Sequence, residues 1–210
     1  MHDSTRPSSQ RKRRDIFQAA ELVFLRDGFV GASMDEVAQL SGVSKQTIYN
    51  HFGSKGDLFV ALVSWMTTSA GDWVRPEPLE LPEGTDVADY LEEYAVRQLT
   101  AVLDPRLLRL RRLVIGEVSR FPDLARALWE NGPERAIDAL EGLFGRLSND
   151  GVLLDTDPHL AAETYNWLVM SAPLNKAMLM GDDHLPDAKA LREHAREAVR
   201  VFLAAYRAHP

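Results

Sequence analysis

The sequence predicts an all-α fold in which a small N-terminal group of helices precedes a larger helical C-terminal region. Apolar residues recur at helical spacing along most of the 210-residue chain, and we find no alternating strand pattern or tandem repeat in it. Helix-start signals are also frequent. Ser or Asp stands directly before several of these segments, and proline follows it in Asp104-Pro105 and Asp157-Pro158.

Four helices are expected in the N-terminal part, at residues 11–26, 33–41, 44–51 and 54–71. Ile16 and Phe24 lie on one apolar face of the first helix, which Gly28 ends. The second begins with a capping-box pattern, in which the Ser33 hydroxyl accepts from a free backbone N–H and Glu36 reaches back.

Five further helices are expected in the remainder, at residues 86–103, 105–119, 122–149, 158–180 and 187–207. Gly132-Pro133 marks a break in the third of these, and Pro173 should kink the fourth. Residues 73–84 hold three prolines and are expected to form a linker.

The composition excludes several classes of protein. With 45% hydrophobic and 26% charged residues, the 23.5-kDa chain is typical of a globular protein. The absence of cysteine excludes disulfides, thiolate metal sites and a cysteine nucleophile, and it fits a reducing compartment. No signal peptide and no run of roughly 18 apolar residues is present. We therefore expect a cytoplasmic protein with no membrane partner.

Charge is distributed unevenly along the chain. The net charge of −7 divides into +1 over residues 1–60 and −8 over residues 61–210, so the two parts are expected to have different partners. Arg6 and residues 11–14 make the N-terminus basic. Such an arm either follows a DNA backbone or enters a minor groove, or it is a solvated tail.

Residues 33–52 have the spacing of a helix-turn-helix. Gly42 allows the tight turn between two short helices, while Val37 and Ile48 have the spacing to close a small core with the first helix. The second short helix leaves a polar face without a carboxylate, made of Lys45, Gln46, Thr47, Tyr49, Asn50 and His51. These side chains can bond phosphates and base edges in a major groove. The alternative, an amphipathic helix with a solvated polar face, does not explain why the turn and both caps coincide with this face.

Residues 11–65 resemble the N-terminal DNA-binding region of the TetR family of bacterial regulators. The residues that carry the resemblance are Ile16, Ala20, Phe24, Gly28-Phe29, Ser33–Ala38, Gly42-Val43-Ser44, Ile48–Phe52, Lys55, Leu58 and Phe59. Residues 112–147 and 168–180 are similar to the C-terminal region of the AefR-like subgroup. The resemblance implies a homodimeric, ligand-responsive DNA-binding protein with a three-helix helix-turn-helix domain and a larger helical domain for dimerisation and effector binding.

The resemblance also implies positions for the DNA contacts and for the domains. Its motif places the contacts at Ser33, Ser44, Lys45, Gln46, Thr47, Tyr49, Asn50, His51 and Lys55. Lys55 also stands at a helix N-terminus, where backbone N–H groups favour a phosphate. We expect a basic flexible arm at residues 1–10, the DNA-binding domain at 11–70, and the effector-binding and dimerisation domain at 71–210.

Two further sets of residues are interpreted from helical spacing. Aromatic and methionine side chains are candidates for lining a cavity for a small apolar or aromatic effector, against the alternative of ordinary core packing: Trp65, Met66, Tyr94, Trp129, Trp167 and Met170. Apolar stripes on the last two helices are candidates for a four-helix dimer interface, against the alternative of monomer core: Tyr165, Leu168, Leu191, Ala195, Ala198 and Phe202.

The residues needed for catalysis or metal binding do not form a recognisable pattern. The histidines do not pair at helical spacing, and no nucleophile elbow, phosphate loop or dinucleotide fingerprint occurs. We therefore expect no enzyme activity, metal or cofactor. The expected function is a repressor that binds a palindromic operator in double-stranded DNA and is released by an effector; alternatives are a ligand-responsive activator, a helical enzyme and a protein-interaction module.

Overall fold

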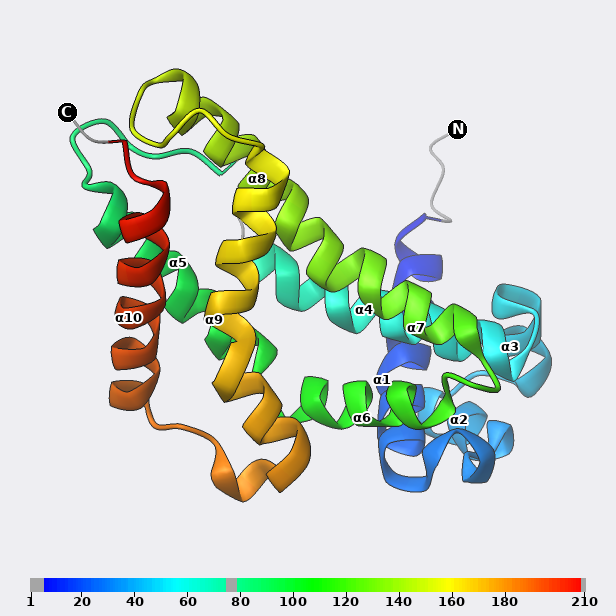
Figure 1. The fold of residues 1–210 in the computed structure, drawn as a ribbon. Helices are drawn as coiled ribbons and strands as arrows, with labels where there is room; N and C mark the ends of the chain where they lie inside the picture. The colour runs from blue at the N-terminus through cyan, green and yellow to red at the C-terminus, as the bar shows by residue number, and fades with distance from the viewer. Residues whose placement is uncertain (1–5, 75–78, 209–210) are drawn as a thin grey trace, which may run out of the picture. The chain divides into compact units, whose positions relative to one another are not determined.

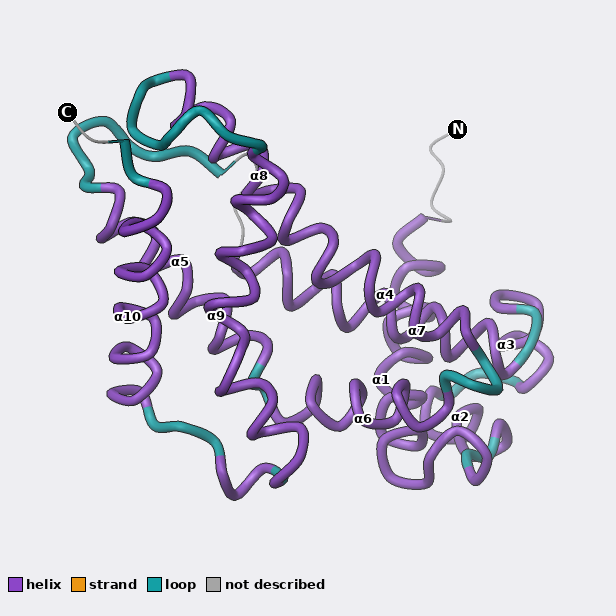
Figure 2. Tube along the Cα trace, viewed as in Figure 1, coloured by secondary structure: helices purple, strands orange, loops and turns teal. Residues whose placement is uncertain are grey.

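The computed structural model describes residues 6–74 and 79–208, apart from the side chains of residues 6–8 and Trp73. Helix dominates this part of the chain, as Figure 1 and Figure 2 show, and it holds no strand. One isolated antiparallel bridge joins Leu153 to Arg207. These observations confirm the all-α fold. No helix within the described ranges is long and apolar enough to cross a membrane.

The elements follow the expected order with small shifts of their ends. In chain order they are α1 (Arg6–Gly31), α2 (Met34–Ser41), α3 (Lys45–Phe52), α4 (Lys55–Val74), α5 (Val87–Val102), α6 (Pro105–Glu117), α7 (Pro122–Trp129), η1 (Glu130–Glu134), α8 (Arg135–Asn149), α9 (Pro158–Met180), η2 (Asp182–His184) and α10 (Ala188–Tyr206). The expected break at Gly132-Pro133 is confirmed, since a π-helical turn replaces regular α-helix there. Proline lacks the N–H that a continuous α-helix would need at that position.

Helix α1 differs from expectation at both ends. It begins at Arg6, so residues 6–10 are helical rather than a flexible arm, while residues 1–5 lie outside the described residues. Proline at position 7 is compatible with this start because the first turn of a helix has no use for its N–H. Gly28 does not end the helix outright but kinks it, with φ 73° and ψ 175°.

The chain divides by its internal contacts into two compact units. The first comprises Met1–Met66 with Arg109–Leu128, and the second comprises Thr67–Leu108 with Trp129–Pro210. Residues 109–128 thus pack with the N-terminal helices, which the sequence pattern does not reveal. The assignment of residues 11–70 to DNA binding and 71–210 to effector binding and dimerisation remains a prediction.

The core of the first unit is rich in stacked aromatic rings. Phe24 lies 4.7 Å from Phe59 and 6.0 Å from Phe29 between ring centroids, and Phe29 meets Phe121 at 4.4 Å. Aromatic pairs at such distances stabilise a core beyond the area that they bury. This core joins α1, α4 and the segment after α6.

In the second unit, α9 packs against α8, α10 and α5, and α10 lies beside α5 (Figure 1). Pro173 stands inside α9 and cannot donate to the carbonyl oxygen of Val169. The ring of His194 on α10 supplies that bond, with Nε2 2.8 Å from the Val169 oxygen. A bond between helices thus compensates for the one that proline removes.

Candidate nucleic-acid interface

A capped turn joins α2 to α3. Ser33 accepts from the backbone N–H of Glu36 at 3.5 Å, and Gly42 ends α2 in the left-handed conformation, with φ 68° and ψ 20°. A side chain at Gly42 would meet nothing within 4 Å, so the requirement for glycine comes from the backbone conformation alone. The turn that the sequence predicts is therefore present at the expected residue.

The N-terminus of α3 is closed by its own side chains. Ser44 accepts from the backbone N–H of Thr47 at 3.1 Å, and the two hydroxyls lie 2.8 Å apart. Ile48 is fully buried and anchors the helix in the core. With one face fixed by Ile48, the opposite face of α3 points to solvent.

This outward face is polar, as the sequence predicts. Four of its side chains are exposed and two are half-buried: Lys45, Gln46, Asn50 and His51, then Thr47 and Tyr49. Gln46 donates to the Asn50 side-chain oxygen at 2.9 Å. Thr47 and Gln46 together present hydroxyl and amide groups, which can read base edges in a major groove.

One carboxylate from the neighbouring helix borders this face. Asp35 on α2 accepts from the Lys45 ammonium at 3.0 Å, and this hydrogen bond raises the pKa of Lys45. The absence of a carboxylate in the α3 sequence therefore does not leave the surface free of one. Lys45 must exchange Asp35 for a phosphate oxygen if it contacts DNA.

Lys55 is positioned differently from the expected surface cation. Its ammonium donates to the Val30 carbonyl oxygen at 3.1 Å and lies 5.1 Å from the centre of the Phe29 ring. Partial burial lowers its pKa. In this arrangement Lys55 holds the N-terminus of α4 to the end of α1, and a phosphate contact requires it to leave Val30.

Glu36 does not complete the expected capping box. Its carboxylate accepts from the Arg26 guanidinium at 2.7 Å, and the same guanidinium donates to Asp27 at 2.6 Å and 2.7 Å. These bonds raise the pKa of Arg26 and lower that of Asp27. These ion pairs hold α2 against α1. Glu36 therefore makes a contact between helices in place of the local capping-box contact with Ser33.

The basic residues 11–14 are exposed on α1, whereas the side chain of Arg6 lies outside the described residues. The Arg13 guanidinium lies over the rings of Phe17 and Phe52, at 5.4 Å and 5.8 Å from their centres. Arg13 is thus tied to the end of α3, so a basic group borders the polar face on this side.

Family models match both parts of the chain. Residues 16–62 match the model described as "Bacterial regulatory proteins, tetR family", and residues 89–208 match "AefR-like transcriptional repressor, C-terminal domain". The chain belongs to the TetR family. It is a sequence-specific DNA-binding transcriptional regulator, and members of this family act as dimers on DNA operators.

Relatives of this TetR-family regulator match over nearly the whole chain. The transcriptional repressor SCO4008 of Streptomyces coelicolor is 42% identical over 201 residues, which cover 88% of this chain and 91% of that protein. A TetR-family structure from Mesorhizobium loti has a TM-score of 0.84 at 34% identity, covering 95% and 98% of the two chains. The structure described as "Flavonoid-responsive Regulator FrrA" has a TM-score of 0.78 at 30% identity, covering 94% and 98%.

The six predicted effector residues fall into separate groups. Trp65 stacks on Phe17 at 5.2 Å in the first unit, where Met66 is buried. Tyr94 and Met170 are buried in the core of the second unit. Trp129 and Trp167 stack on each other at 6.2 Å on its surface, with 44% and 40% of their areas exposed. Two of the six residues thus belong to the first unit and four to the second, and their role in effector binding stays a prediction.

Most of the predicted dimer residues lie in the core of the second unit, and the dimer interface itself stays a prediction. Four of the six are buried within the single chain: Tyr165, Ala195, Ala198 and Phe202. Phe202 packs on the ring of Phe144 at 5.0 Å, and the Tyr165 hydroxyl donates to the Leu91 carbonyl at 2.6 Å. Leu168 and Leu191 are half-buried against the same core. These helices therefore use their most apolar faces within the monomer.

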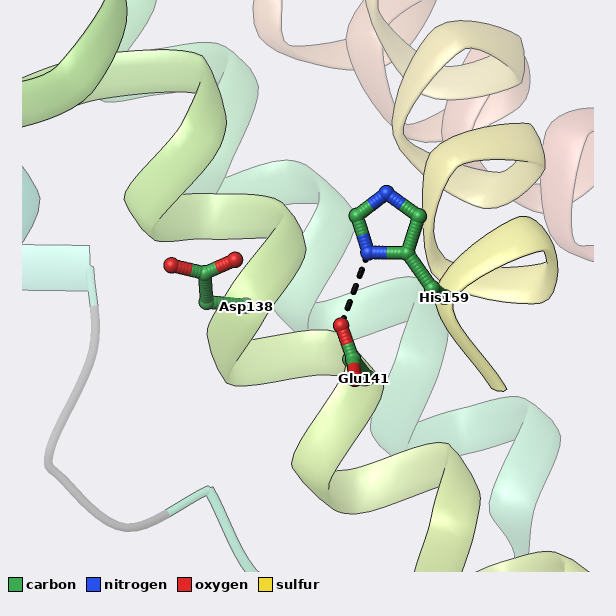
Figure 3. Close-up of side chains that lie close together, drawn as sticks. All are labelled: Asp138, Glu141 and His159. Atoms are coloured by element: carbon green, nitrogen blue, oxygen red, sulfur yellow. Dashed lines mark hydrogen bonds and ion pairs between the residues drawn. The ribbon is translucent and has the colours of Figure 1, made fainter. Parts of the chain in front are cut away.

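Sequence patterns also missed a small cluster of ionisable side chains. Asp138 and Glu141 on α8 and His159 on α9 have potential ligand atoms within 4.8 Å of one another (Figure 3). His159 Nδ1 lies 2.7 Å from the Glu141 carboxylate, and this bond raises the pKa of His159. Beside the carboxylates is an open hollow of about 540 Å³, lined by Asp138, Glu141, Gly142, Gly145, Arg146, Asn149 and Pro158. The contact in the structure is an ion pair between two helices.

Proposed function

We propose that this chain binds a palindromic operator as a homodimer and represses transcription until a small effector releases it. The observation that carries the proposal is the geometry of α3. Its inner face is fixed by buried Ile48 and its outer face is polar and lacks a carboxylate of its own. A helix held in this way can enter a major groove and place its N-terminal side chains on base edges.

The position of each side chain on α3 supports a division of roles. Gln46 and Thr47 stand in the first turn and carry no charge, so we assign them to base readout. Lys45, Tyr49 and His51 are assigned to phosphates, together with Ser33, Ser44, Asn50 and Lys55 at the edges of the motif. Two of these groups first exchange an internal partner, because Lys45 bonds Asp35 and Lys55 bonds Val30.

The test is selection of bound genomic fragments by the purified protein, followed by titration of the recovered operator at several salt concentrations. Gln46→Ala should relax preference at one base pair and cost about 1–3 kcal/mol there. Lys45→Ala should weaken binding to all sequences alike and reduce the salt slope by about one. Lys189→Ala, which removes the same charge from α10, is the matched control and should change neither.

Two results would contradict this proposal. One is recovery of fragments with no shared sequence. The other is an operator affinity that stays the same in Gln46→Ala and Lys45→Ala as in the control. A reporter gene placed behind the operator distinguishes a repressor from the alternative, a ligand-responsive activator: transcription should rise when the protein is deleted.

For the dimer interface we propose an exposed face of α9. Leu160 and Trp167 lie two helical turns apart on that face and are 51% and 40% exposed, although both are large and apolar. Members of this family act as dimers, so we expect a second copy of the chain to bind at such exposed apolar surface. Trp167→Glu should therefore give a monomer in sedimentation and weaken operator binding.

Leu179→Glu is the control for this substitution. Leu179 is 77% exposed on the same helix but faces another direction, because twelve residues separate it from Trp167. The added charge is the same in both variants. If Trp167→Glu stays dimeric at micromolar concentration, or if Leu179→Glu dissociates equally, the interface lies elsewhere.

For the effector we propose a small aromatic molecule that carries hydroxyl groups. Two observations support this class. Tyr94 and Tyr165 lie 6.4 Å apart in the core of the second unit, so this core already accommodates aromatic rings with polar tips. A solved structure that is 30% identical over nearly the whole chain is described as flavonoid-responsive. We take a flavonoid as the model for the class.

A further inference from the structure

Two side-chain amides lie in the core of the second unit. Gln98 on α5 and Asn166 on α9 are only 5% and 2% exposed. The Gln98 amide nitrogen donates to the Asn166 side-chain oxygen at 2.9 Å. Their neighbours one helical turn away, Tyr94 and Met170, are buried as well. The pair therefore lies within the apolar region between the two helices.

Two of the four polar side-chain atoms in this pair lack a hydrogen-bond partner among the described residues. No group among the described residues bonds the Gln98 side-chain oxygen or the Asn166 side-chain nitrogen, although both atoms are fully buried. Exchanging oxygen and nitrogen in both amides would again leave one acceptor and one donor, so the deficit does not depend on their orientation. A buried polar atom without a partner has lost its bonds to water and gained none in return, so each of the two destabilises the folded chain relative to a bonded atom.

An apolar pair of similar size would avoid this cost. Replacing both partners of a buried hydrogen bond by apolar groups of the same shape is often neutral or stabilising. The amides thus contribute less to folding than leucines could at these positions. A buried donor and acceptor side by side are, by contrast, what a site needs to select a ligand by its polar groups.

We propose that Gln98 and Asn166 form the polar recognition point of the effector site. A hydroxyl group of the ligand donates to the Gln98 oxygen, and a ligand oxygen accepts from the Asn166 nitrogen. The ligand is neutral, because neither amide offers a charge that could offset the burial of an ion. This inference rests on the proposed effector class and adds the residues that distinguish a hydroxylated ring from a bare one.

The surrounding side chains suit an aromatic ligand. Tyr94 is one turn from Gln98, and Met170 is one turn from Asn166 on the same face of α9. Methionine adapts its shape readily and makes favourable contacts with aromatic rings. Two of the six effector candidates from the sequence therefore flank the amide pair.

The test compares two ligands and four proteins. Naringenin, a flavanone with phenolic hydroxyls, is paired with unsubstituted flavanone, which keeps the ring system and lacks those hydroxyls. The proteins are the wild type, Gln98→Leu, Asn166→Leu and the double variant. Ligand affinity is measured by calorimetry, stability by thermal unfolding, and operator binding in the same preparations.

The wild type should bind naringenin more tightly than flavanone. The double variant should lose naringenin affinity by about tenfold or more and lose clearly less of its flavanone affinity, because only naringenin carries a hydroxyl that can donate to the Gln98 oxygen. The double variant should also unfold at the same or a higher temperature than the wild type. Each single variant should be less stable than the wild type and than the double variant, since it leaves one amide without its partner in the core.

Met170→Leu is the control variant, since it alters packing beside the pair without removing a polar atom. It should change the affinities for both ligands by the same factor. Equal loss of both ligands in the double variant, unchanged naringenin affinity, or no naringenin binding to the wild type would each overturn the inference. Failure of the double variant to fold would also overturn it, because the pair would then be a structural requirement. Operator binding by the wild type reports separately on the proposed function.

Discussion

The contact between Asp35 and Lys45 should limit the affinity of this regulator for DNA. The two side chains are 77% and 45% exposed and 3.0 Å apart. An exposed pair of this kind stabilises the fold by only about 0.2–1 kcal/mol. When Lys45 turns to a phosphate, the Asp35 carboxylate stays nearby. Two like charges about 4 Å apart in water repel each other by about 1 kcal/mol. We therefore expect Asp35→Asn to tighten operator binding by about 1–2 kcal/mol, or roughly 5- to 30-fold.

The assay is an operator titration by fluorescence anisotropy at low and high salt. The gain from Asp35→Asn should be largest at low salt and shrink as salt rises, because mobile ions screen exposed charges. In a Lys45→Ala background the gain should be smaller, since no competing ion pair remains to be broken. The variant should lose up to about 1 kcal/mol of stability, because Asp35 also stands in the first turn of α2, where the helix dipole favours a carboxylate.

Asp89→Asn is the matched control, since it removes an exposed carboxylate from the first turn of α5 in the other unit. It should change operator affinity much less than Asp35→Asn. The reasoning is refuted if Asp35→Asn binds the operator no more tightly than wild type at low salt. It is refuted as well if the gain is identical in the Lys45→Ala background.

Three further predictions concern single contacts. Gly42→Ala should destabilise the protein by about 1–2 kcal/mol in urea unfolding, and Gly42→Asn by less, because asparagine tolerates the left-handed conformation; equal losses would mean that the turn rearranges. Ile48→Ala should cost about 2–5 kcal/mol, whereas Val30→Ala, at an exposed site, should be nearly neutral in the same assay. An NMR titration should place the pKa of His159 above 6.5, and Glu141→Gln should lower it; because the folded pKa is raised, the stabilisation by this pair is present below pH 6.5 and is lost as the pH rises through the folded value. An unchanged His159 pKa in Glu141→Gln would show that the pair is not formed in solution.

The DNA-binding motif was predictable from the sequence because its determinants are local. Ser33, Gly42 and Ser44 each act on a backbone group within a few residues, and the structure places each at the helix end where the sequence predicts a cap or a turn. The inward position of Ile48 also follows from helical spacing alone. Such features depend little on the rest of the fold.

Contacts between distant segments were not predictable in the same way. Glu36 could have bonded the nearby backbone of Ser33, but its carboxylate bonds Arg26. Lys55 stands at the N-terminus of α4, but its ammonium bonds the Val30 carbonyl oxygen. Each choice depends on where α1 ends relative to α2 and α4. The kink at Gly28 sets that geometry, and the sequence shows only that a glycine is present.

The apolar faces of α9 and α10 show a different limit of sequence patterns. Periodicity tells that a face is buried, but the burial of Tyr165 and Phe202 against Phe144 satisfies the pattern without a second subunit. The exposure of side chains in the folded chain distinguishes the inner face of α9 from its outer face. Trp167 is 40% exposed, while Asn166, its neighbour in sequence, is buried. A helix at a protein surface usually buries its aromatic side chains and exposes its polar ones. At these two positions α9 does the reverse. That reversal is why α9 is the element on which both the effector contact and the subunit contact are proposed.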